Sequence, residues 1–302
     1  MVYSPCCARI LPNERKIRLA KNIILCADST CDLSEELLEK YNVHLVPLHV
    51  LEGENSYLDG VDIDPDTIYA TYAEKGVLPK TAAVNVSEYI DFFKPFIEAG
   101  NEVIHINIGS ALSSSHNNCK LAAEELPGVY PVDSRNLSTG SGHLVIEAAE
   151  RIAKGMAAAD IVAELNEIAG RVSASFVIDT LEYLYKGGRC SALAMFGANL
   201  LRLKPSIRVD NADGSMGVDK KYRGSLDKAL EQYVADQLEG RDDIVPTRIF
   251  ITHSGISEER IDMVRELVKK YQRFDEILVT RAGCTISSHC GPNTLGVLFI
   301  TK

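Results

Sequence analysis

The stretch Val103–Leu126, VIHINIGSALSSSHNNCKLAAEEL, predicts a strand, a turn and a helix in direct succession. Its opening residues are mostly apolar and β-branched, which is typical of a buried strand. The strand ends at Gly109, and a helical pattern runs from about Asn117 to Leu126. A buried strand that leads through a glycine turn into a helix is the repeating unit of α/β folds.

The turn between this strand and helix is rich in hydroxyl groups, contributed by Ser110, Ser113, Ser114 and Ser115. Backbone N–H groups at a helix start lack intrahelical partners, and together with the helix dipole they favour a small anion. Serines before a helix are also common N-caps. Both interpretations stay open on sequence alone, although four hydroxyl groups exceed what one cap requires.

The beginning of the chain repeats the strand–helix–strand order. We expect a strand at Asn22–Ala27, a helix from Asp32, as the cap, to about Tyr41, and a strand at Val43–Val50. This order predicts a parallel βαβ unit. Ligands bind at the carboxyl ends of strands in open α/β sheets. Polar turns follow three predicted strands there, at Asp28–Thr30, Gly109–Ser110 and Asp133–Ser134.

The second half of the chain predicts a mixed α+β arrangement. Asn211–Gly214 is a hairpin signal between two predicted strands, and Leu193–Leu201 reads as an apolar helix. The overall fold class expected is α/β with two domains. The expected parts are an extension at 1–21, a parallel α/β domain at 22–172 and a mixed-sheet α+β domain at 173–302.

Composition excludes several classes of protein. The net charge of −10 over 302 residues argues against nucleic-acid binding and against an anionic membrane surface. No apolar run is long enough to span a membrane, so we expect no stable membrane insertion. None of the eight cysteines forms a C-x-x-C pair, so we expect neither a metal site nor a disulfide framework. We find no secretion signal and therefore expect a cytoplasmic protein.

One segment departs from the acidic balance. Between Lys186 and Arg223 there are eight basic and three acidic residues, a net charge of about +5. This asymmetry indicates either a docking face for an acidic or phosphate-bearing partner or a solvated surface. Within it, Arg189 follows Gly187 and Gly188, which read as a helix end.

A second polar cluster lies at Ala282–Asn293 and contains His289. A loop histidine beside hydroxyl groups serves either as a general base or as a neutral hydrogen-bond donor. We expect an extended loop, in which His289 and its neighbour Cys290 point in opposite directions. No complete catalytic motif is present in the sequence.

Taken together, the motifs resemble those of the DegV family of fatty-acid-binding proteins. The resemblance runs in order along nearly the whole chain from Ile23. Six segments carry it: Asp28–Leu33 with Val46–Leu48, the segment headed by Thr81, Ser110–Ser113, Asp133–Ser134, Leu184–Arg189 and His289–Pro292.

The resemblance implies a long-chain fatty acid in a cleft between the two domains. Its carboxylate would be held by Thr81, Ser113 and His289, and we add Ser114 as a neighbouring candidate. The protein would carry the acid without altering it, use no cofactor, and present the carboxylate to a partner fatty-acid kinase. Arg189 and Arg223 match basic positions implied in that docking.

The candidate tail lining is apolar, and each of its residues is also a plausible core residue. It comprises Phe176 through Leu193, Phe196, Leu200 and Leu201. Two alternatives stay open: an acyl hydrolase or transferase that uses Ser113 and His289, and an interaction module that uses the basic segment.

Overall fold

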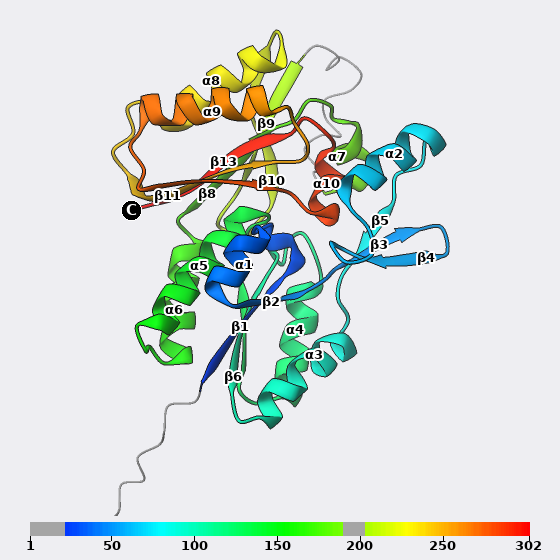
Figure 1. Ribbon diagram of the computed structural model, residues 1–302, viewed down its shortest axis with the longest axis vertical. Coiled ribbons are helices and arrows are strands. Elements are labelled where there is room, and N and C mark those ends of the chain that lie inside the picture. The colour runs from blue at the N-terminus through cyan, green and yellow to red at the C-terminus, as the bar shows by residue number, and fades with distance from the viewer. Residues whose placement is uncertain (1–21, 190–202) are drawn as a thin grey trace, which may run out of the picture.

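The computed structural model describes residues 22–189 and 203–302 (Figure 1). Outside these residues lie the predicted extension at 1–21, the predicted helix at 193–201 with its candidate lining residues, and Cys6, Cys7 and Cys190. In the described residues, two large sheets stack, with helices between and outside the sheets, which confirms the expected mixed α/β class.

The first sheet is parallel and has the order β2-β1-β6-β7. Its apolar strand residues alternate between two helical layers, one on each face. The strands are β1 (Ile23–Asp28), β2 (Val43–Val46), β6 (Glu102–Asn107) and β7 (Val129–Asp133). On one face lie α3 (Val86–Glu98) and α4 (Ser115–Glu125); on the other lie α1 (Glu35–Tyr41), α5 (Thr139–Ala153) and α6 (Ala158–Ala169).

The second sheet is mixed and has the order β10-β9-β8-β13-β11-β12. Its strands are β8 (Val172–Val177), β9 (Leu203–Val209), β10 (Met216–Arg223), β11 (Ile244–His253), β12 (Glu276–Arg281) and β13 (Leu295–Thr301). The predicted hairpin is present as antiparallel β9 and β10. The helices α8 (Leu226–Leu238) and α9 (Glu258–Tyr271) cover its outer face.

Helix α5 joins the two sheets because it is apolar around most of its circumference. Leu144, Val145 and Ile146 are all fully buried, and the same core contains strand residues of both sheets. A helix that is buried all round lies inside a structure rather than on its surface. The two sheets therefore share one continuous core at α5.

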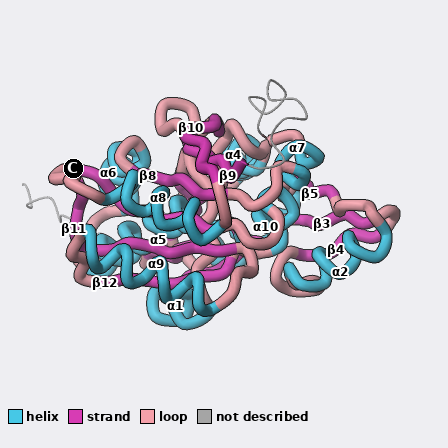
Figure 2. Tube along the Cα trace, turned by 90° about the horizontal axis from the view of Figure 1, so that it is seen from above, coloured by secondary structure: helices cyan, strands magenta, loops and turns pink. Residues whose placement is uncertain are grey.

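A third, small sheet was not expected from the sequence. It has the order β4-β3-β5, with β3 (His49–Glu52), β4 (Asn55–Leu58) and β5 (Lys80–Ala82), and it lies beside α2 (Pro65–Lys75) (Figure 2). The single strand predicted at Val43–Val50 is wrong, because the chain leaves the first sheet after Val46. Pro47 has no N–H group to continue a ladder, and this explains the break.

The predicted cap of α1 is also corrected. Helix α1 is capped by the Ser34 hydroxyl, which accepts from the Leu37 N–H group, and not by Asp32. Helix α3 begins with a capping box between Asn85 and Glu88. No helix of residues 22–189 and 203–302 is long and apolar enough to cross a membrane.

Candidate functional site

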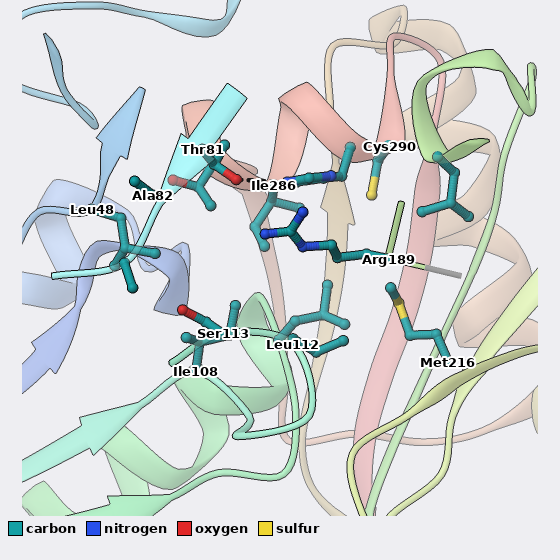
Figure 3. A pocket seen from close by; sticks show the side chains of 15 residues that line it. Leu48, Thr81, Ala82, Ile108, Leu112, Ser113, Arg189, Met216, Ile286 and Cys290 are labelled. Carbon is teal, nitrogen blue, oxygen red and sulfur yellow. Dashed lines mark hydrogen bonds between the residues drawn. The ribbon is translucent and has the colours of Figure 1, made fainter. Parts of the chain in front are cut away.

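A cavity lies where the three sheets approach one another (Figure 3). Residues of both halves of the chain form its wall, and most of them are apolar. The wall comprises Leu48, Thr81, Ala82, Ala83, Ile108, Leu112, Ser113, Leu137, Leu184, Arg189, Met216, Thr285, Ile286, His289 and Cys290.

Thr81 and His289, which are 208 residues apart in sequence, meet in this wall. Thr81 Oγ1 lies 2.8 Å from His289 Nε2. Strand β5 supplies the threonine, and α10 (Cys284–Cys290) supplies the histidine. Burial lowers the pKa of His289 to about 4, with a further contribution from the charge of Arg189. The imidazole is therefore neutral at pH 7.

The surroundings of the imidazole favour one tautomer. His289 Nδ1 is buried and has no hydrogen-bond partner. An N–H group at Nδ1 would be buried without an acceptor, which costs more free energy than a buried lone pair without a donor. The proton is therefore best placed on Nε2, where it donates to Thr81 Oγ1. The Thr81 hydroxyl proton is then free to donate to a ligand.

Gly187 has a role that sequence analysis missed. It lies within α7 (Glu182–Gly187), and the left-handed residue that ends the helix is Gly188, at φ +67°. A Cβ atom on Gly187 would lie 2.2 Å from His289 Nδ1. Only glycine leaves room for the imidazole at this position. The Gly-Gly pair therefore ends a helix, as expected, and also seats the histidine.

The segment that carries His289 is a helix, and the extended loop predicted there is wrong. Two buried carboxyl groups cap it: Asp59 accepts from the Cys284 and Thr285 N–H groups, and Asp32 accepts from the Gly283 N–H group. Because the segment is helical, His289 and its neighbour Cys290 both reach the cavity wall.

Ser113 lies in the cavity wall opposite Thr81 (Figure 3). Its Oγ atom is 3.0 Å from Ser115 Oγ. Ser114, predicted beside it, is exposed and lies outside the wall, so we leave it out of the proposed site. The turn offers few free N–H groups, because Gly109 donates to the Asn136 carbonyl and Ser110 donates to Asp133.

Arg189 lies in the cavity wall, a position that the sequence analysis did not predict. The docking role expected for Arg189 stays a prediction. Figure 3 shows its side chain extending between Thr81 and Leu112. Arg223 lies at the end of β10 and is exposed. Other cations of the basic segment are neutralised locally, in the pairs Lys186–Glu182, Lys204–Asp179 and Lys220–Asp236.

A second cavity adjoins the first. Leu137, Ile286 and Cys290 belong to the walls of both cavities, and Phe176, one of the predicted lining residues, lies in the second. Most of the second wall is apolar, with Ala174, Val209 and Leu298 among its residues. The site thus has a polar end at Thr81, Ser113 and His289 and an apolar extension behind Ile286.

Comparison with known proteins agrees with this architecture. A family model described as "Uncharacterised protein, DegV family" matches residues 22–302. The chain belongs to the DegV family. A DegV domain-containing protein of Clostridium perfringens is 29% identical over 296 residues, which cover 93% of this chain and 99% of that protein. Protein DegV of Bacillus subtilis is 28% identical over 284 residues, or 93% of this chain and 100% of that one.

Solved structures of DegV proteins have the same fold. A DegV protein from Thermus thermophilus, described as fatty-acid-binding, superposes with a TM-score of 0.83 at 29% identity, covering 93% of this chain and 100% of its own. A stearic-acid-binding protein from Eubacterium ventriosum superposes with a TM-score of 0.79 at 27% identity, covering 93% and 98%. The order of motifs in the sequence therefore identified the family correctly.

Proposed function

We propose that this DegV protein binds a long-chain fatty acid, with the carboxylate at Thr81, Ser113 and His289. The observation that carries the proposal is the Thr81–His289 pair at one end of a mainly apolar cavity. The Thr81 hydroxyl has a proton to donate, and Arg189 supplies a positive charge in the same wall. The acyl chain extends past Leu137 and Ile286 into the second cavity.

The tail contributes most of the affinity in this arrangement. Burial of a methylene group is worth about 0.8 kcal/mol, so some fifteen of them give roughly 12 kcal/mol before the costs of binding. Each hydrogen bond to a charged head group adds about 1.5–3 kcal/mol. The polar residues therefore orient the acid, and the apolar walls hold it.

The geometry favours a carrier over a hydrolase. A serine hydrolase needs a hydrogen bond from its serine to a histidine that a carboxylate orients. Here Ser113 bonds to Ser115, and His289 Nε2 bonds to Thr81. His289 Nδ1, where an orienting carboxylate would bind, has no hydrogen-bond partner.

Presentation of the carboxylate to a partner kinase is the further part of the proposal. Arg189 is exposed and lies in the cavity wall, so it is placed to contact both the bound head group and a docked protein. Arg223 would extend the docking face. In this view residues 22–172 and 173–302 act as two domains that enclose the acid, in the cytoplasm and without a cofactor.

The direct test is a titration with palmitic acid and with hexadecanol, which has the same chain and a neutral head. The wild type binds the acid saturably, and Thr81→Val weakens acid binding about tenfold, as expected for one lost hydrogen bond to a charged group. Hexadecanol binding changes less. Thr247→Val, at an exposed position of β11 outside both cavities, is the matched control. A wild-type protein that shows no saturable acid binding would refute the proposal.

A further inference from the structure

One hydroxyl group in the wall of the first cavity has no role in the proposed site. Thr285 lies on α10 and belongs to this wall, as does His289, which follows one helical turn later. Thr285 is 4% exposed, and its Oγ1 atom is buried without a hydrogen-bond partner among the described residues. A buried hydroxyl group that makes no hydrogen bond costs free energy, so its presence in a cavity wall needs a reason.

The other two hydroxyl groups of this wall are both bonded to protein atoms. Thr81 Oγ1 lies 2.8 Å from His289 Nε2, and Ser113 Oγ lies 3.0 Å from Ser115 Oγ. The backbone N–H group of Thr285 is also bonded, because it donates to Asp59 at 3.1 Å and so helps to fix the start of α10. In the described part of the wall, the Thr285 hydroxyl is therefore the one whose proton has no acceptor in the protein.

The position of Thr285 along α10 assigns it to the head-group end of the site. Residues four apart in a helix lie on the same face, with Cβ atoms about 5–6 Å apart. His289, four positions after Thr285, is the residue of α10 that contacts Thr81. Ile286 belongs to the walls of both cavities, whereas Thr285 belongs to the wall of the first cavity and not to that of the second. Thr285 therefore lies beside the proposed carboxylate and not along the apolar extension.

A carboxylate can accept about four hydrogen bonds on its two oxygen atoms. The proposed site supplies three donors, from Thr81, Ser113 and Arg189. We propose that the Thr285 hydroxyl is the fourth donor, which makes Thr285 a residue that selects an acid over a neutral head group; this inference rests on the proposed fatty-acid site. The protein without ligand carries the cost of the unpaired hydroxyl group, and a bound carboxylate removes that cost.

The test is Thr285→Val, which removes the hydroxyl group and keeps the shape of the side chain. Protein stripped of lipid should melt about 2–4 °C higher than the wild type, because an unpaired polar group has been replaced by an apolar one. Palmitic acid should bind about tenfold more weakly, and hexadecanol should change by less than about threefold because its neutral head accepts weaker hydrogen bonds. Thr285→Ser keeps the hydroxyl group and should bind palmitic acid within about threefold of the wild type.

Thr30→Val is the matched control. Thr30 is 1% exposed, its Oγ1 atom also has no hydrogen-bond partner in the described chain, and it lies outside both cavity walls. The control should melt higher in the same way but bind palmitic acid as the wild type does. Unchanged acid binding in Thr285→Val, equal losses for acid and alcohol, or a melting temperature below that of the wild type would overturn the inference. A wild-type protein that binds no acid would instead refute the proposed function, which distinguishes the two failures.

Discussion

The substitution Gly187→Ala adds one methyl group where the structure has no space for it. The new Cβ atom would lie 2.2 Å from His289 Nδ1, whereas an ordinary contact begins at 3.4 Å. The imidazole must therefore move by about 1.2 Å. From the present 2.8 Å, a shift of this size carries His289 Nε2 to as much as about 4 Å from Thr81 Oγ1, beyond hydrogen-bonding range.

The expected loss is roughly 1.5–3 kcal/mol of fatty-acid binding, or at least about tenfold in Kd. Gly187 does not have the positive φ at which an alanine would be strained, so the backbone accepts the change. The fold should therefore survive. Displacement of a fluorescent fatty acid by palmitic acid measures the Kd, and Gly217→Ala is the control because a Cβ there meets no atom within 4 Å. An unchanged Kd in Gly187→Ala would refute the claim that His289 holds the head-group site in place.

Three further predictions follow from the same geometry. Ile286→Phe narrows the passage between the two cavities. If the larger side chain excludes about four methylene groups of the acyl chain, palmitic acid loses roughly 3 kcal/mol of binding free energy, or about two orders of magnitude in Kd, whereas the shorter decanoic acid is little affected. Equal effects on the two acids in the same titration would contradict the proposed path of the tail. Burial raises the pKa of Asp32 to about 8, so its protonated form contributes stability that is fully present below about pH 4 and is lost as pH rises through about 8. Asp32→Asn removes this dependence, so the melting temperature of the variant should rise relative to that of the wild type between about pH 5 and pH 9. A melting-temperature difference that stays constant with pH would contradict the pKa shift. Arg189→Gln should weaken palmitic acid binding several-fold at low ionic strength. Because the side chain is exposed, the difference in Kd between variant and wild type should shrink as salt is added. A difference that does not depend on salt would argue against a charge contact.

Local patterns in the sequence predicted most of the framework. The strand and helix of Val103–Leu126 are present as β6 and α4, and the hairpin at Asn211–Gly214 joins β9 and β10. These elements depend on alternation, helical period and turn residues, all of which lie within a few positions of one another. Long, strongly patterned segments are therefore readable from one sequence.

Helix α10 was not readable in this way. Its seven residues are mainly small and polar, with no apolar period, and its stability depends on Asp32 and Asp59, which lie more than 220 residues earlier in the chain. Asp32 was noticed as a helix cap, but of the wrong helix. Its left-handed backbone, at φ +50°, turns the carboxyl group toward the Gly283 N–H group instead of toward α1.

The candidate site was predicted in part. The family resemblance named Thr81 and His289, and the structure brings these two side chains into contact. It also named Ser113, which lies in the same wall. The seat for His289 at Gly187 depends on packing between α7 and α10, which no local spacing in the sequence encodes.

The most direct test of the account is the identity of the ligand that accompanies the protein. Gently purified protein should be analysed by native mass spectrometry and then denatured, with the released small molecules measured separately. We expect an intact complex with one bound molecule and release of a long-chain fatty acid, in the wild type and, at much lower occupancy, in Thr81→Val. Protein that carries no lipid and takes up none when palmitic acid is added would contradict the central claim.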